Sequence, residues 1–133
     1  MAARAVDIAV SFVDLINSGD ARGIVVAVTP GSSFFVDGED PTVGREALRI
    51  AWSGYFAAFP NYVIFIDETH EKSDAVYLVG HTSGSHVPQE EESLPSSVIW
   101  RCKVTAGLVS EWSIYNASMT NRTRFGLGHA PAA

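Results

Sequence analysis

The sequence predicts an α+β domain in which three N-terminal helices pack on a curled, mostly antiparallel sheet. Apolar residues recur at helical spacing through most of the N-terminal half and at every second position after Pro60. Helices therefore precede a run of strands. The chain has 133 residues, which is the usual size of one domain with one core. Because helices and sheet share that core, we expect the sheet to curl into a cone with one open end, a shape suited to binding small ligands.

Three segments are predicted to be helical. The segment 2–17 has a broad apolar stripe opposite a polar side. A shorter helix is expected over 20–28. The third helix starts at Val43 or Gly44, and Pro60 ends it because proline disfavours helical geometry in the residue before it. Large apolar side chains occupy one face of this third helix: Leu48, Trp52, Tyr55, Phe56 and Phe59.

Five segments read as strands, with turn residues between them. The predicted strands are 33–36, 62–69, 75–87, 97–105 and 108–117. Gly80 and Gly84 lie inside the third of these, where glycine indicates a bend or a bulge.

Two polar segments are expected to contribute little to the core. The segment 88–95 contains three successive glutamates, Glu90 to Glu92, and is predicted to be a solvated loop. Residues 118–133 are predicted to form a loosely held C-terminal tail. The expected organisation is one domain over 1–117 followed by this tail.

Composition excludes several classes of protein. With 15 acidic and 9 basic residues, the net charge is −6, which disfavours a nucleic-acid partner because such proteins need a basic face. A single cysteine rules out an internal disulfide. No apolar run reaches the ~20 residues of a membrane span, and no secretory leader is visible. We therefore expect a cytoplasmic protein with neither a nucleic-acid nor a membrane partner.

Short motifs along nearly the whole chain are typical of one superfamily. They are Phe12–Asp20, Phe35–Gly38, Gly44–Leu48, Phe56–Pro60, Gly80–Gly84, Gly107–Trp112 and Phe125–His129. In this order they resemble the nuclear-transport-factor-2-like superfamily with its cystatin-like fold. The similarity is greatest to the SnoaL-like branch, which includes polyketide cyclases, and to the ketosteroid-isomerase-like branch. The resemblance implies the cone-shaped fold and a homodimer, whereas activity differs among proteins that share this fold.

The resemblance also implies a candidate base. Asp37 stands just after the first strand, at the position that looks like the general base of ketosteroid isomerases; a competing interpretation is that it caps the turn with Gly38. Phe12 stands at the position of the isomerase tyrosine, and Ile99 or Trp100 at that of its acid. Asn116 stands near the position that looks like the acid/base aspartate of the SnoaL-type cyclases. An amide there is able to bind a ligand but not to transfer a proton.

Histidines supply a second candidate for acid/base chemistry. His81 lies on the long strand and is a candidate acid, base or ligand donor because imidazole titrates near neutrality. His86 is five residues away, on the opposite face of a regular strand. This spacing disfavours a shared metal ion, and no metal or cofactor is expected.

Aromatic residues are the expected ligand contacts. Phe12 and Trp100 are joined by Trp52, Tyr55 and Phe56 of the third helix. On the last strand, alternation places Trp112 and Asn116 on one face, which we expect to point into the cone. Apolar side chains of the opposite sheet face are expected to form the homodimer surface: Tyr77, Val79, Ile99 and Tyr115.

The sequence therefore predicts binding of a small apolar cyclic molecule that carries a carbonyl or hydroxyl group. Proton transfer of the isomerase or cyclase type, with Asp37 as base, is the predicted chemistry. The alternative is a non-catalytic ligand-binding or dimerisation module whose cavity is plugged by tryptophans.

Overall fold

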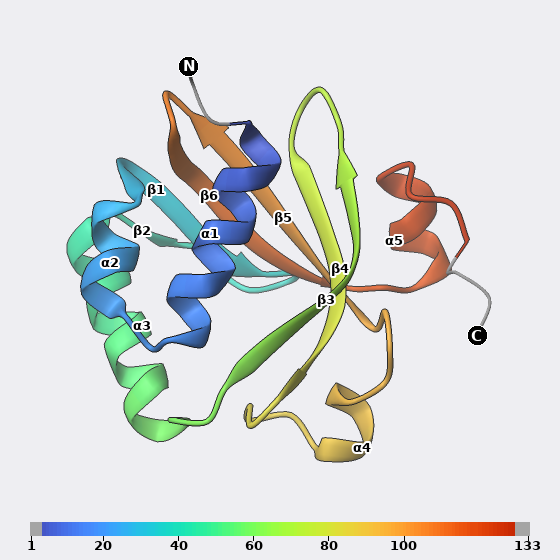
Figure 1. The fold of residues 1–133 in the computed structure, drawn as a ribbon, viewed down its shortest axis with the longest axis horizontal. Helices are drawn as coiled ribbons and strands as arrows, with labels where there is room; N and C mark the ends of the chain where they lie inside the picture. The colour runs from blue at the N-terminus through green and yellow to red at the C-terminus, as the bar shows by residue number, and fades with distance from the viewer. Residues whose placement is uncertain (1–3, 130–133) are drawn as a thin grey trace.

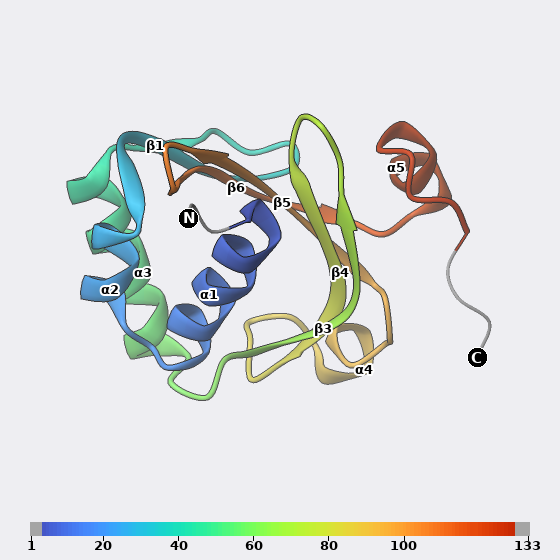
Figure 2. The same cartoon turned by 45° about the horizontal axis from the view of Figure 1, so that its top comes forward.

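A computed structural model describes residues 4–129 and has helices packed on a curled, unclosed sheet, which confirms the predicted α+β class (Figure 1). Helix α1 lies in the hollow of the sheet, and α2 and α3 flank it (Figure 2). A further helix, α5, lies on the other side of the sheet. Among the described residues, no helix is long and apolar enough to cross a membrane.

All three predicted N-terminal helices are present, as α1 (Ala5–Asn17), α2 (Ala21–Val26) and α3 (Arg45–Ala58). Residues 2 and 3 of the first predicted helix lie outside the described part of the chain. Asp20 joins α1 to α2 and accepts a hydrogen bond from the backbone N–H of Gly23 at 2.9 Å. This contact satisfies one of the free N–H groups at the start of α2.

Six strands form one sheet in the order β2-β1-β6-β5-β4-β3. Neighbouring strands are antiparallel except β1 and β6, which are parallel. Their bounds are β1 Val28–Val36, β2 Thr42–Val43, β3 Val63–Glu71, β4 Val76–Ser83, β5 Val98–Thr105 and β6 Leu108–Asn116.

The first strand is longer than the predicted 33–36. It starts at Val28, and its register with β6 shifts between Val28 and Ser33. Pro30 and Gly31 lie within this irregular stretch. Strands tolerate proline and glycine at such bulges. The two residues follow the expected helix over 20–28 and are part of a strand.

The two glycines of the long predicted strand have different roles. At Gly80, an added Cβ would lie 1.9 Å from the carbonyl oxygen of Phe65, next to a register shift between Ile66 and Glu68. Gly84 has a φ of 71°, so the chain turns there, and β4 ends at Ser83 rather than continuing to Val87. The predicted bend is confirmed at Gly84, whereas at Gly80 the bulge lies in the neighbouring strand β3.

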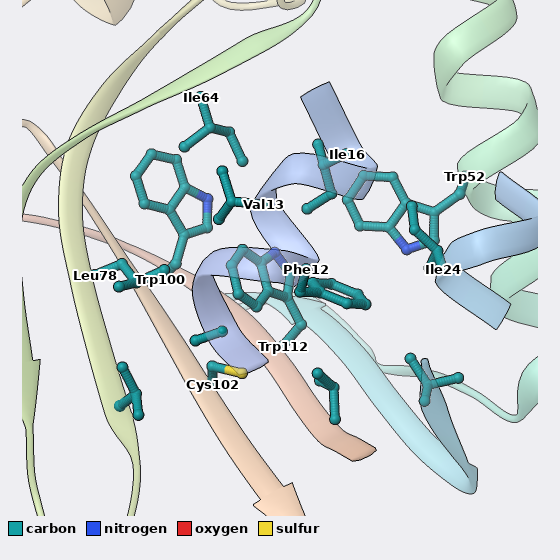
Figure 3. Packing of buried hydrophobic residues seen from close by; sticks show 14 of the residues in the cluster. Phe12, Val13, Ile16, Ile24, Trp52, Ile64, Leu78, Trp100, Cys102 and Trp112 are labelled. Atoms are coloured by element: carbon teal, nitrogen blue, oxygen red, sulfur yellow. The ribbon is translucent and has the colours of Figure 1, made fainter. Parts of the chain in front are cut away.

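The main core lies between α1, α3 and the inner face of the sheet. Figure 3 shows Trp100 and Trp112 from the sheet grouped with Phe12 and Val13 of α1. The rings of Phe12 and Trp112 are 5.0 Å apart. As predicted from strand alternation, Trp112 and Ile114 belong to this inner cluster, whereas Tyr115 belongs to a second cluster.

The second cluster lies between the outer face of the sheet and the C-terminal segment, which includes α5 (Met119–Arg124). Leu127 packs in this cluster, and Arg122 is 2% exposed and forms a bidentate ion pair with Glu68, with N–O distances of 2.8 and 3.0 Å. This packing differs from the loosely held tail that we expected, because apolar contacts and a buried ion pair hold the segment. Residues 130–133 of that tail lie outside the described part.

The same segment covers the expected homodimer surface. All four outer-face side chains are at most 3% exposed: Tyr77, Val79, Ile99 and Tyr115. They therefore belong to the core of this chain as the structure describes it.

Candidate functional site

A cavity of about 790 Å³ opens between α3, the inner face of the sheet and the segment that joins β4 to β5. Trp52 and Trp100 line this cavity without filling it. Its apolar wall comes from α3 and from the central strands: Phe34, Val36, Ala51, Trp52, Val98, Trp100 and Ile114. Concave apolar sites of this size are the usual binding sites of small molecules.

Helix α3 supplies the aromatic side of the cavity. Trp52 packs edge-on against Phe34 of β1, with ring centroids 5.4 Å apart, and against Phe56 at 5.5 Å. Tyr55, three residues after Trp52, lies on the same helix face and also lines the cavity. Phe56 supports Trp52 and is absent from the cavity lining.

A buried carboxylate forms part of the cavity wall. Glu92 is the last residue of the short helix α4 (Gln89–Glu92) and is 6% exposed. Its Oε2 atom accepts hydrogen bonds from Thr82 Oγ1 at 2.8 Å, from the backbone N–H of Ser85 at 3.2 Å and from Ser85 Oγ. The expectation of a solvated loop over 88–95 is thus wrong at Glu92, because the turn after β4 supplies enough donors to bury its charge.

The electrostatic balance at Glu92 favours the charged form. Burial by itself raises the pKa of Glu92, but the hydrogen bonds from Ser85 and Thr82 outweigh burial and hold the pKa below the usual range of a glutamate. The carboxylate is therefore ionised near neutral pH. The negative charge makes it a good hydrogen-bond acceptor, and its lowered pKa makes it a weak base.

Two tyrosines and a histidine lie beside this carboxylate. Tyr55 Oη lies 2.8 Å from Nδ1 of His86, and the rings of Tyr55 and Tyr62 are 5.1 Å apart. Tyr62 is 9% exposed, and its hydroxyl has no hydrogen-bond partner among the described residues. Burial, together with the nearby Tyr55 and Glu92, raises the pKa of Tyr62, so its hydroxyl stays protonated over the physiological range.

The two predicted acid/base residues lie outside the cavity lining. Asp37 is exposed at the end of β1, where its backbone N–H donates to the carbonyl of Ile114 at 2.9 Å. His81 faces away from the cavity, with Nδ1 2.9 Å from Asp67 Oδ2 and its ring stacked on Phe65 at 4.9 Å. The structure does not bring these two residues to the aromatic wall.

The predicted ligand contacts fall into two groups. Trp52, Tyr55, Trp100 and Asn116 line the cavity. Phe12 and Trp112 belong to the core, with Phe56 packed against it. The indole N–H groups of Trp100 and Trp112 are fully buried without a partner in the described part of the chain, so Trp100 offers the cavity its ring and not its nitrogen.

Sequence reasoning missed Glu92 and Tyr62. No local pattern separates Glu92 from Glu90 and Glu91, because only the fold places Thr82 and Ser85 around one of the three. Tyr62 was interpreted as the start of a strand, whereas β3 starts at Val63. Within residues 4–129, no group of three or more histidine, cysteine, aspartate or glutamate residues has a geometry suited to a metal ion.

Comparison with solved structures shows the same fold in several proteins. An uncharacterised cystatin-fold protein from Novosphingobium aromaticivorans is 17% identical, with a TM-score of 0.71, and the match covers 86% of this chain and 98% of that one. The epoxide hydrolase/cyclase-like enzyme SalBIII, described in pyran ring formation in the polyether salinomycin, is 15% identical, with a TM-score of 0.70. This match covers 87% of this chain and 92% of SalBIII. An NTF2-like protein of unknown function from Cytophaga hutchinsonii is 9% identical, with a TM-score of 0.67, and the match covers 87% of this chain and 92% of that one.

Sequence comparison assigns the family. No curated protein matches this chain. The family model for the SnoaL-like domain matches residues 9–112, which include most of α1, all of α2 and α3, and most of the sheet. The chain therefore belongs to the SnoaL-like domain family, as its motifs indicated.

Proposed function

We propose that this protein binds a small, largely apolar cyclic molecule carrying a carbonyl or hydroxyl group. The observation that carries the proposal is the cavity of about 790 Å³, which joins an aromatic wall to a group of polar side chains. An apolar ring system would bury its faces against Trp52 and Phe34. A polar substituent would find donors and acceptors at Tyr55, Tyr62 and Glu92.

Proton transfer of the isomerase or cyclase type is the reaction that we propose for the bound molecule. The family assignment and the cyclase-like neighbour SalBIII support this class of reaction. The role of Asp37 as base, with His81 as a second acid/base group, stays a prediction from the sequence. An Asp37→Asn variant with unchanged folding is expected to lose turnover of any substrate found, and unchanged turnover in it would remove Asp37 from the mechanism.

A ligand screen by thermal shift tests binding. Cyclic ketones, phenols, steroids and aromatic polyketide-like compounds form the panel. A ligand at about a hundred times its Kd stabilises by about 2.7 kcal/mol, or about 8 °C in Tm for a chain of this size. A flat response over the whole panel would count against the cavity as a binding site.

A matched pair of variants locates the ligand. Ala51 and Ala57 are both exposed on α3, but only Ala51 lines the cavity. Ala51→Phe is expected to narrow the cavity and abolish the thermal shift. Ala57→Phe adds the same ring elsewhere on the helix and should preserve the shift. Equal shifts in the two variants would place the ligand outside the cavity.

A non-catalytic ligand-binding protein is the second candidate function. It is favoured by the lowered pKa of Glu92, because the one buried carboxylate of the lining is a weak base. In this case ligands give a thermal shift in the intact protein, but mass spectrometry after long incubation finds them unchanged.

A further inference from the structure

The charge of the cavity lining has one sign. Among the described residues, Glu39, Glu91 and Glu92 line the cavity and no lysine or arginine does; the lining also includes the imidazole of His86, which lies 2.8 Å from the Tyr55 hydroxyl. Glu39 and Glu91 are exposed, so water and salt screen their charges. Glu92 is buried, and its field inside the cavity is screened much less. An anionic ligand would therefore be repelled, whereas a cationic group would be attracted.

Glu92 has an unused bonding position. The hydrogen bonds that it accepts from Thr82 and Ser85 all end on Oε2, and the nearby backbone N–H of Gly84 also lowers its pKa. No side chain of the described residues donates to Oε1. None of the ion pairs of the described residues includes this carboxylate. A buried charge is normally paired with an opposite charge. The free oxygen and the absent countercharge together leave a place for a cationic donor.

Tyr62 provides independent evidence for a polar ligand group at this end. Its side chain is nine-tenths buried and lines the cavity, and its hydroxyl has no partner among the described residues. The hydroxyl is not one of their fully buried unpartnered atoms, so it is open to a ligand group that would supply the missing hydrogen bond. The rings of Tyr55 and Tyr62, 5.1 Å apart, also offer aromatic surface, and aromatic faces attract ammonium groups.

We infer that the cavity selects a ligand whose apolar ring system carries a protonated amine, and that Glu92 Oε1 accepts the hydrogen bond from this ammonium group. The inference rests on the proposed binding function and adds to it the charge of the ligand. Glu92 acts as a specificity residue, and Tyr62 offers a second oxygen to the same group. A neutral alcohol also donates one hydrogen bond, but without the charge that strengthens it.

Three ligands on one bicyclic frame separate charge from shape: 2-aminotetralin, 2-tetralol and 1,2,3,4-tetrahydro-2-naphthoic acid. Their Kd values are measured by calorimetry at pH 7 and low ionic strength. The amine is expected to bind at least about tenfold more tightly than the alcohol, which is the difference between charge-assisted and neutral hydrogen bonds. The carboxylate is expected to bind most weakly.

Matched variants assign the selectivity to one side chain. Glu92→Gln is expected to remove most of the amine-to-alcohol ratio. Glu90→Gln removes the same charge from the same helix at an exposed position outside the cavity lining, and should keep the ratio. Glu92 also holds the turn after β4, so its replacement can disturb folding. Tyr62→Phe provides a second variant, in which the affinity for the amine is expected to fall several-fold.

The outcomes separate this inference from the proposed function. If amine and alcohol bind equally, or the carboxylate binds best, the inference is wrong and binding in the cavity stands. If the amine keeps its advantage in a folded Glu92→Gln protein, Glu92 is not the selecting residue. If Glu92→Gln does not fold, the order of the three ligands in the intact protein and the effect of Tyr62→Phe decide. If none of the three binds, the proposed function fails for this ring class, and the inference fails with it.

Discussion

Gly80 illustrates how one residue shapes the pairing of two strands. A Cβ at this position would lie 1.9 Å from the carbonyl oxygen of Phe65, so any other residue must push β3 and β4 apart. The bulge between Ile66 and Glu68 lies at the same place. Bulges of this kind bend a strand and increase its twist, and here they help to curl the sheet around α1.

We expect Gly80→Ala to lower the free energy of unfolding by about 2 kcal/mol or more, because backbone must move to admit the methyl group. Gly54→Ala is the matched control, since Gly54 is exposed on α3 and its added Cβ would meet nothing within 4 Å. That control should stabilise the protein by about 0.5–1 kcal/mol, because alanine favours helix. Urea denaturation followed by tryptophan fluorescence measures both, and an equal effect of the two variants would contradict the steric argument.

At the scale of elements, the C-terminal segment depends on a charge pair that its own sequence does not reveal. The Arg122 guanidinium holds the pKa of Glu68 at about 2, against burial, which raises it. Arg122 also donates to the carbonyl oxygens of Gly128 and His129. One side chain therefore joins β3 to the end of the described chain.

This pair predicts a loss of stability in acid. The pKa of Glu68 is lower in the folded than in the unfolded protein, so its contribution is present above about pH 5 and is lost as the pH falls towards 2. Between pH 6 and pH 3 we expect the contribution of the ion pair to the free energy of unfolding to fall by about 2 kcal/mol. Denaturation curves at the two pH values give the free energy of unfolding. Its fall from pH 6 to pH 3 should be smaller by this amount in Glu68→Gln than in the intact protein.

Glu71→Gln is the control for this experiment. Glu71 lies on the same strand, and its ion pair with Arg4 is exposed, with relative side-chain accessibilities of 69% for Arg4 and 41% for Glu71. Water screens such a pair, so the control should follow the pH dependence of the intact protein. A Glu68→Gln curve parallel to that of the intact protein would show that the pair does not couple pH to folding.

At the scale of the whole molecule, the covered outer face of the sheet bears on assembly. The homodimer expected from the family resemblance stays a prediction. The four side chains expected at its surface are buried under Leu127 and Phe125 in this structure. A dimer that used this face would first have to displace the C-terminal segment.

We therefore expect dimerisation through this face only in a chain shortened to end at Ala117, which exposes Tyr77 and Tyr115. Sedimentation velocity over a range of concentrations compares the two chains, after circular dichroism has shown that the shortened one is folded. The shortened chain should associate with at least about tenfold higher affinity, since each 1.4 kcal/mol of newly available apolar contact gives that factor. Equal association of both chains would place any dimer on another surface.

The core could be predicted largely from periodicity. Apolar spacing located α1, α3 and the strands β3 to β6, because each element has to bury one face whatever its partners are. The C-terminal segment shows the limit of this reasoning. Phe125 and Leu127 are few and irregularly spaced, and their burial depends on a sheet face built from distant parts of the chain.

The candidate site could be predicted only in part. Trp52, Tyr55, Trp100 and Asn116 were expected as ligand contacts and do line the cavity. Their identification followed from helix faces, strand alternation and family resemblance. Asp37 and His81 were selected by resemblance and by residue chemistry, which do not report where a side chain points, and both lie outside the lining.

The sequence by itself determined the fold class, the family, the three N-terminal helices and the strands β3 to β6. These depend on local conformational preferences and on apolar patterns that hold for each segment alone. Only the tertiary structure decided that a cavity remains between α3 and the sheet, that Glu92 is buried while Glu90 and Glu91 are not, and that the C-terminal segment covers the outer face. Each of these depends on groups far apart in the chain: Glu92 keeps its buried charge because Thr82 and Ser85 donate to it, and Arg122 is held by Glu68, 54 positions earlier.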